Sequence, residues 1–327
     1  MLYLCLFGHL SVANCDGPAP WPSIDLSGRP GSLLAYLALA RGRFFARGEL
    51  LTALWPDQAE TGSLQSFNTA LWRLRKALAR PPLAQDEIVV CDKRGAVGLP
   101  VEAKLRVDVD EFSRLVAPGL AKPMDQLDAS HIDQLRRGVA MYRDDILAGF
   151  TDDWALRVRE MHRRTLFNAL ARLMQVSTLA QDYAAAIGHG QAILDRDPLR
   201  EDVHRELMRL FMLHGQRALA LQQFELCRNA LRKELAIEPM RETMALYQQI
   251  ADSAVGRNSA PVPTAPVQWQ IRPLQVSEAQ PAYRPVGGED ASQLSPRELI
   301  ARAQWYLAQA DSKLQRHGDD ADRHPLA

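Results

Sequence analysis

The feature that most constrains the fold is a repeated pair of amphipathic helices between residues 166 and 231. The segment LFNALARLMQVSTLAQDYAAAIGHGQAILDRDP matches DVHRELMRLFMLHGQRALALQQFELCRNAL in helix length and turn position, with Ala184 and Ile187 lying 34 residues before Ala218 and Leu221. Helix pairs repeated at this period are typical of tetratricopeptide solenoids, whose stacked pairs share one core. Because helical periodicity begins near VDVDEFSRL and ends near residue 253, we expect an all-α, tetratricopeptide-like domain over residues 107–253.

Residues 1–106 have a different pattern, in which short apolar runs alternate with helical segments. The runs LYLCLFGHLSV and SIDLSG predict strands, and the prolines between them break the chain. RPGSLLAYLALARG and ARGELLTALWP predict two helices, the second ended by Pro56. After the loop PDQAETG and a third helix, EIVVCDKRGAVGLP predicts a β-hairpin with Lys93 and Arg94 at its tip. We therefore expect an α+β domain here.

The third helix, SLQSFNTALWRLRKALARP, has two contrasting faces. Apolar residues recur at intervals of three and four, which predicts one buried stripe consisting of Leu64, Phe67, Leu71, Leu74 and Leu78. Cations, polar groups and one aromatic residue fall outside that stripe. They are Gln65, Ser66, Thr69, Trp72, Arg73, Lys76 and Arg80. No acidic residue occurs between Ser63 and Gln85, so the exposed face should be locally positive.

Charge and element order together favour duplex DNA as the partner of this face. The whole chain has a formal net charge of zero, so any affinity for nucleic acid must come from the placement of its charges. Strands, two helices, a loop, a basic helix and a basic hairpin follow one another as in a winged helix-turn-helix. In that arrangement the third helix enters the major groove and the hairpin touches the DNA backbone. An alternative is a helical-repeat interaction scaffold in which the basic face is merely solvated.

Two longer stretches resemble a known family of bacterial regulators. ARGELLTALWPDQAETGSLQSFNTALWRLRKAL is similar to the OmpR-type winged helix of SARP-type transcription regulators. Downstream, YRDDILAGFTDDWALRVREMHRR and AILDRDPLREDVHRELMRLFMLHGQRALALQQFELCRNALRKELAIEPMRETMALYQQI resemble the bacterial transcriptional activator domain (BTAD). The resemblance covers roughly residues 2–252, with the two parts in the expected order. It supports a multidomain chain of a winged helix followed by a helical activator domain.

This resemblance implies a sequence-specific transcriptional activator that binds promoter repeats in double-stranded DNA, self-associates there and recruits RNA polymerase. Residues Ser63 to Arg80 would form the recognition helix, and Lys93 and Arg94 the wing. The polymerase-facing loop would contain Asp57, Gln58, Glu60 and Thr61. One departure is that the wing of the family commonly ends in a Gly-Tyr pair, whereas this chain has GAVGL, which puts a backbone contact by a wing aromatic in doubt.

The segments after residue 253 form a separate expectation. Residues 254–294 are rich in Pro, Ser and Ala and lack a sustained period, which predicts a disordered linker. Residues 295–318 then have the pattern of an amphipathic helix, with Ser295 as N-cap and Gly318 at its end. This helix would dock on the solenoid or on a partner, or it would form only partly.

No pattern of catalytic or metal-binding residues accompanies these features. The acidic pairs Asp144-Asp145 and Asp152-Asp153 lack a third ligand at useful spacing, and Asp153 is expected to cap the helix that follows it. Histidines do not recur at i, i+4, and serines lack a GxSxG context. We therefore expect no enzymatic activity, no metal and no cofactor.

Cysteine usage and hydropathy favour a cytoplasmic protein without a membrane partner. The four cysteines lack CxxC spacing, which is typical of reduced, packed thiols. The opening run MLYLCLFGHLSVANC has no basic start and is broken by Gly8 and His9, so a strand is expected there rather than an export signal. No run approaches the roughly 20 apolar residues that a membrane span requires.

Overall fold

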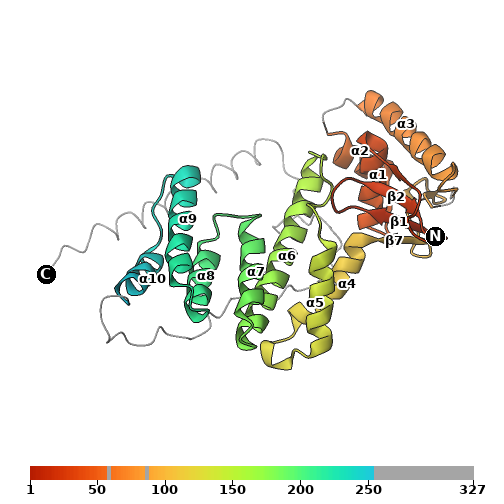
Figure 1. The fold of residues 1–327 in the computed structure, drawn as a ribbon. Coiled ribbons are helices and arrows are strands. Elements are labelled where there is room, and N and C mark those ends of the chain that lie inside the picture. Colours follow the sequence, from red (N-terminus) through yellow and green to blue (C-terminus); the bar gives the residue numbers. More distant parts are fainter. Residues whose placement is uncertain (57–59, 85–87, 254–327) are drawn as a thin grey trace, which may run out of the picture. The chain divides into compact units, whose positions relative to one another are not determined.

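The computed structural model describes residues 1–56, 60–84 and 88–253, and within α3 it describes side chains from residue 64 onward (Figure 1). The expected linker (254–294) and the expected helix (295–318) lie outside the described residues. The fold class predicted from the sequence is confirmed: an α+β winged helix-turn-helix is followed by an all-α, tetratricopeptide-like arrangement.

A four-stranded sheet opens the chain. Its strands are β1 (Leu2–Cys5), β2 (Ser11–Asn14), β3 (Ser23–Asp25) and β7 (Leu105–Val107), in the order β3-β2-β1-β7. β1 pairs antiparallel with β2 and parallel with β7, which the chain reaches only after the winged helix is complete. The single strand expected over LYLCLFGHLSV is wrong: the stretch forms two strands, because Gly8, with φ of +85°, lies in the turn between them.

Three helices and a small second sheet form the winged helix. The helices are α1 (Gly28–Leu39), α2 (Arg47–Leu54) and α3 (Glu60–Ala79). The strands β4 (Phe44–Phe45), β5 (Val90–Cys91) and β6 (Val97–Gly98) pair in the order β4-β6-β5. Antiparallel pairing of Val90 with Gly98 and of Cys91 with Val97 confirms the expected hairpin. α3 begins at Glu60, so the predicted loop PDQAETG is shorter than expected.

In the part of the chain that the structure describes, seven α-helices and one short 3₁₀ helix follow. They are α4 (Asp108–Ala121), η1 (Met124–Gln126), α5 (Ala129–Met141), α6 (Asp153–Leu179), α7 (Tyr183–Leu194), α8 (Glu201–Leu213), α9 (Arg217–Leu235) and α10 (Arg241–Asp252). Figure 1 shows α6 to α9 side by side in chain order. The 34-residue repeat is visible in the backbone and in the core. Gln181 and Gly215 both have positive φ in the turns after α6 and α8, and Ala186 and Ala220 are both fully buried.

Two apolar cores are joined by a short shared region. The first core surrounds Phe45 and Phe67 and takes in Ile146, Leu147, Trp154 and Ala155 from beyond the winged helix. The second core is built from residues of all the α-helices from α4 to α10. Phe7 packs against both cores, and its ring lies 5.4 Å from that of Phe112 and 4.6 Å from that of Tyr142.

Asp108 holds the backbone at this shared region. Its carboxylate accepts hydrogen bonds from the amides of Leu6, Phe7 and Val109 at 2.8–3.0 Å. Burial raises the pKa of Asp108 to about 6, and the three amide donors only partly offset that effect. The segment that follows β1 is thereby fixed to the first residue of α4.

The start of α6 differs from the sequence expectation. Asp153 is the first helical residue rather than the N-cap, and Asp152 occupies the cap position without a side-chain capping bond. Instead, Asp152 accepts a hydrogen bond from Arg29 Nη1 at 2.6 Å. An ion pair with α1 has therefore replaced the local cap, a tertiary contact that sequence spacing does not reveal.

Candidate nucleic-acid interface

α3 is held in place by four of the five apolar residues predicted to form its buried stripe. Phe67, Leu71, Leu74 and Leu78 are buried against the first core. The Phe67 ring meets Trp55, at the end of α2, edge to face with 5.9 Å between centroids. The fifth residue contradicts the prediction: Leu64 is 42% exposed. The N-terminal part of α3 therefore extends beyond the helices that cover the rest of its apolar side.

The predicted DNA-binding residues of α3 lie at the surface. Ser66 is half-buried, and the other six are exposed. These are Gln65, Thr69, Trp72, Arg73, Lys76 and Arg80. Successive residues three and four apart lie on one side of a helix, so Arg73, Lys76 and Arg80 form a continuous cationic strip. Their role in DNA binding stays a prediction.

Trp72 and Lys76 form a pair on this face. Trp72 is 59% exposed, an unusual position for the largest apolar side chain. The Lys76 ammonium lies 4.4 Å from the centroid of its ring, at a distance suited to a cation–π interaction. Such a contact orients the ring along the helix surface while leaving one ring face open.

The hairpin tip has a defined turn. Asp92 Oδ1 accepts hydrogen bonds from the amides of Arg94 and Ala96, each at 2.8 Å. Gly95, with φ of +80°, completes the turn by donating to the Asp92 carbonyl at 3.0 Å. Lys93 and Arg94 are exposed at the tip, as the sequence predicts. Asp92 therefore shapes the turn, and the two cations project from it.

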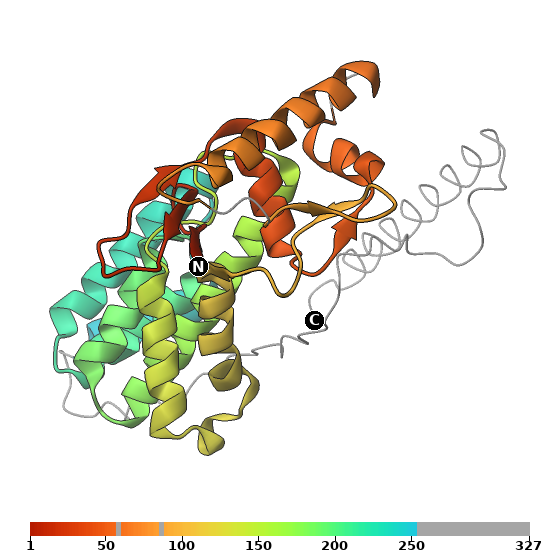
Figure 2. The same ribbon diagram turned by 90° about the vertical axis from the view of Figure 1, so that its right-hand side faces the viewer.

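Arg75 connects the helix to the hairpin, a role that the sequence analysis missed. Its Nη2 atom lies 3.3 Å from the Val89 carbonyl oxygen and 3.3 Å from Cys91 Sγ, on either side of β5's first residue. Figure 2 shows the hairpin, in gold, in the same part of the molecule as α3. Helical spacing gave a partial signal, because Arg75 lies four residues after Leu71 and three before Leu78 and is therefore beside the buried stripe.

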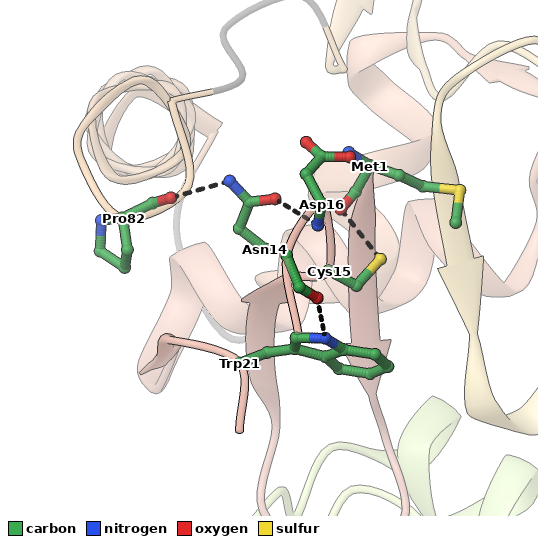
Figure 3. Close-up of polar contacts among 7 residues, drawn as sticks. Met1, Asn14, Cys15, Asp16, Trp21 and Pro82 are labelled. Carbon is green, nitrogen blue, oxygen red and sulfur yellow. Dashed lines mark hydrogen bonds and ion pairs between the residues drawn. The ribbon is translucent and has the colours of Figure 1, made fainter. Parts of the chain in front are cut away.

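A contact from the first sheet holds the chain just after the C-terminal end of α3. Asn14, the last residue of β2, donates from Nδ2 to the Pro82 carbonyl oxygen at 3.1 Å (Figure 3). The side-chain oxygen of Asn14 accepts from the Asp16 amide at 3.1 Å, which fixes the orientation of its amide group. The chain leaving α3 is thus tied to β2, and the helix axis is fixed at its C-terminal end.

The candidate cations have no acidic partner in the part of the chain that the structure describes. Arg73, Lys76, Arg80, Lys93 and Arg94 take part in none of its ion pairs, whereas exposed cations of α5 and α6 such as Arg137 and Arg164 pair with acids one turn away. An unpaired cation keeps its charge available to phosphate groups, because a phosphate can bind it without first displacing an acidic side chain.

The residues expected to face RNA polymerase are only partly described. Asp57 and Gln58 lie outside the described residues, and Glu60 and Thr61 fall in the first turn of α3. Their role stays a prediction.

The described residues form neither a metal-binding cluster nor a membrane-spanning helix. Within residues 1–56, 60–84 and 88–253, no three His, Cys, Asp or Glu side chains lie close enough together to hold a metal ion. None of the described helices is long and apolar enough to cross a membrane.

His204 is buried in the repeat core, where its ring nitrogens lie 3.0 Å from the Pro198 carbonyl oxygen and 2.6 Å from Gln223 Nε2. Burial lowers the pKa of His204.

Two family models match the chain in tandem. Residues 22–95 match the model for the C-terminal domain of transcriptional regulatory proteins, and residues 107–251 match the bacterial transcriptional activator domain. The first range contains α3 and the hairpin tip, and the second contains α4 to α9 and all but the last residue of α10.

Similar proteins include regulators from Streptomyces. Regulatory protein AfsR of Streptomyces coelicolor is 28% identical over 232 residues, which cover 70% of this chain and 23% of AfsR. The chain therefore spans about a quarter of that relative. Regulatory protein DnrI of Streptomyces peucetius is 24% identical over 265 residues, covering 78% of this chain and 94% of DnrI.

A solved structure has the same fold. EmbR of Mycobacterium tuberculosis, in complex with a low affinity phosphopeptide, superposes with a TM-score of 0.60 at 18% sequence identity and covers 77% of this chain and 65% of its own. The tandem family matches, the similarity to these regulators and the observed fold agree with the resemblance found in the sequence. The chain combines an OmpR-type winged helix with a bacterial transcriptional activator domain, which is the domain order of the SARP-type bacterial transcriptional regulators that it resembles.

Proposed function

We propose that this protein is a sequence-specific transcriptional activator that inserts α3 into the major groove of promoter DNA. The observation that carries the proposal is the unpaired cationic strip of Arg73, Lys76 and Arg80, opposite the buried side of α3. Recognition helices of helix-turn-helix proteins place such a face against the groove, where cations contact phosphates and polar side chains contact base edges.

The hairpin supplies a second contact in this proposal. Lys93 and Arg94 would contact the phosphate backbone beside the groove, and Arg75 would set the position of the tip relative to α3. Two contacts fixed relative to each other define a register on the duplex, which a single mobile basic segment does not. The absence of a Gly-Tyr pair at the hairpin leaves the backbone contact to these two cations.

The test begins with selecting duplexes from a random-sequence library and measuring the affinity of the selected site against salt concentration. Affinity should fall steeply as salt rises, because each neutralised phosphate releases counterions. Arg73→Ala and Lys76→Ala should each weaken DNA binding. If the side chain contacts a phosphate, binding to all sequences should weaken equally; if it contacts a base, the sequence preference at one position should relax. For a phosphate contact, the slope of log affinity against log salt should also fall by about 1. Lys233→Ala, an exposed cation of the helical region, is the matched control and should leave binding unchanged.

Two results would contradict the proposal. One is that the purified protein fails to bind any duplex at low ionic strength, which favours an interaction scaffold with a solvated basic face. The other is that Arg73→Ala unfolds the protein, since this would make the side chain structural. Thermal unfolding of each variant, measured beside binding, separates these outcomes.

Activation is a second step of the same proposal. We infer that the loop before α3 and the first turn of α3, with Asp57, Gln58, Glu60 and Thr61, face RNA polymerase when the protein is bound at promoter repeats, and that neighbouring copies associate there. Substituting Asp57 and Glu60 by alanine should preserve promoter binding and reduce transcription in a purified system with bacterial polymerase. Equal losses of binding and transcription would place these residues at the DNA rather than at polymerase.

A further inference from the structure

An open hollow lies on the exposed side of α3, at the place where the predicted buried stripe fails. It is lined by Leu64, Gln65, Asn68, Thr69 and Trp72. Leu64 and Trp72 are 42% and 59% exposed, so two large apolar side chains face solvent a little over two helical turns apart. A departure from the expected burial on a functional helix points to a ligand-contacting surface.

The lining residues fall into two rows along the helix. Leu64, Asn68 and Trp72 are successive fourth residues and form one row, and Gln65 and Thr69 begin the adjacent row that continues to Arg73. From Leu64 to Trp72 the helix rises about 12 Å, which corresponds to between three and four base-pair steps of a duplex. The hollow therefore has the length of a contact with a few base edges.

The chemistry of the hollow differs from that of the strip beside it. None of its five lining residues is charged, whereas Arg73, Lys76 and Arg80 lie toward the C-terminal half of α3. Phosphates are bound mainly by cations, so the cationic half suits the backbone and the uncharged half suits base edges. The Lys76 ammonium, 4.4 Å from the Trp72 ring, marks the boundary between the two halves.

The side chains present favour one kind of base pair. Guanine is most often contacted by arginine or lysine, and the hollow contains neither. Adenine is bound by the amide of Asn or Gln through its N6 and N7 atoms, and the thymine C5-methyl is contacted by apolar side chains. Asn68 lies in the same row as Leu64 and Trp72, between them. The Thr69 hydroxyl donates to the Gln65 carbonyl at 2.9 Å and so has no proton left for a base.

We propose that this hollow recognises an A·T base pair, with the thymine methyl held between Leu64 and Trp72 and the adenine bonded by the Asn68 amide. The inference rests on the proposed DNA binding and adds which base pair α3 reads and which residues read it. Sequence preference at that pair comes from the hollow, while the cations of α3 and the hairpin supply affinity that does not depend on sequence.

The experiment uses the full chain and the duplex selected from a random-sequence library. Each thymine in turn is replaced by uracil, which removes only the C5-methyl group. We expect one position per recognised repeat at which the wild-type protein loses about fourfold in affinity, the value for one methyl-sized group taken out of water. Leu64→Ala and Trp72→Ala should abolish that loss. Asn68→Ala should relax the preference for adenine at the same pair. Replacing that adenine by 7-deazaadenine, which lacks the N7 acceptor, should likewise weaken binding of the wild type.

The matched control is Lys93→Ala at the hairpin tip, which should weaken every duplex by one factor and keep the uracil effect. If the wild type binds no duplex, the proposed function itself fails. If it binds duplexes but no thymine can be told from uracil, only the base-pair inference is overturned. Persistence of the uracil effect in both Leu64→Ala and Trp72→Ala also overturns it, because the methyl would then lie elsewhere. Thermal unfolding of both variants confirms that they are folded when tested.

Discussion

Arg75 Nη2 lies 3.3 Å from the Val89 carbonyl oxygen, so a side chain of the candidate recognition helix holds the base of the hairpin. The same guanidinium reaches Cys91 Sγ on β5. Apart from the core, this contact directly couples α3 to the hairpin that ends in Lys93 and Arg94. The geometry of the proposed interface therefore depends on a residue that lies beside the buried stripe rather than at the exposed face.

Arg75→Ala should loosen the hairpin while the rest of the fold persists. Loss of a partly exposed, charge-assisted hydrogen bond costs about 1 kcal/mol, which raises local opening about fivefold. Trypsin cleavage after Lys93 and Arg94 should accelerate by that factor in the absence of DNA. Arg73→Ala, which removes an exposed cation of the same helix, is the control and should leave the cleavage rate unchanged. Equal rates in Arg75→Ala and wild type would show that the core alone positions the hairpin.

Two leucines of α3 test how its apolar side is buried. Leu74 is fully buried and Leu64 is 42% exposed, although both belong to the same sequence stripe. Leu74→Ala should lower the free energy of unfolding by roughly 2–5 kcal/mol through lost burial and a cavity. Leu64→Ala should change it by about 0.5 kcal/mol or less, as is usual at the surface. Urea unfolding of the two variants checks this, and similar losses in both would restore the simple stripe prediction.

Two glycines of α7 form a second matched pair. A Cβ atom added at Gly190 would lie 2.7 Å from Leu207 Cδ2, whereas at Gly188 it would meet nothing within 4 Å. Gly188→Ala should stabilise the protein by up to about 1 kcal/mol through helix propensity. Gly190→Ala should destabilise it by about 1–3 kcal/mol, because α7 and α8 are forced apart. Thermal unfolding distinguishes them, and a stabilising Gly190→Ala would contradict the close packing of the repeat.

Asp108 predicts a specific pH dependence. Burial raises its pKa to about 6 in the folded state, from the ordinary value near 3.8. Between these values the folded protein binds more protons than the unfolded chain, so this group's contribution to stability falls as pH rises from about 4 to about 6. The size of that fall is about 3 kcal/mol at most. Stability of the wild type relative to Asp108→Asn, measured by urea unfolding, should therefore decline over this range and then level off. A flat difference would show that the carboxyl does not titrate there.

The sequence predicted those parts of the fold that follow from periodicity and turn chemistry. The helix pairs, the 34-residue repeat and the hairpin all come from local patterns, and the buried positions Phe67, Leu71, Leu74 and Leu78 follow from helical spacing. Expectations failed where a distant contact decides the outcome. Leu64 lies at the same spacing as Leu71 but beyond the reach of α1 and α2.

The remaining differences have the same cause. Asp152 pairs with Arg29, which lies 123 residues earlier in the sequence, so no local rule for helix caps predicts its partner. The link from Arg75 to Val89 likewise requires knowing that the hairpin packs beside α3. Placement of the candidate site on α3 came from the sequence, and its boundary between an uncharged half and a cationic half came from the structure.

The parallel pairing of β1 with β7 has a practical consequence for anyone who wishes to study DNA recognition with a shortened chain. β7 follows the hairpin, and Ile146, Leu147, Trp154 and Ala155 complete the core beneath α1. Truncation after residue 95, where the match to the regulatory domain ends, would remove the edge strand that pairs with β1 and uncover leucines of the first core. A shortened version that retains the opening sheet would have to extend past Ala155. The winged helix and the first helices of the activator region would therefore have to be produced together.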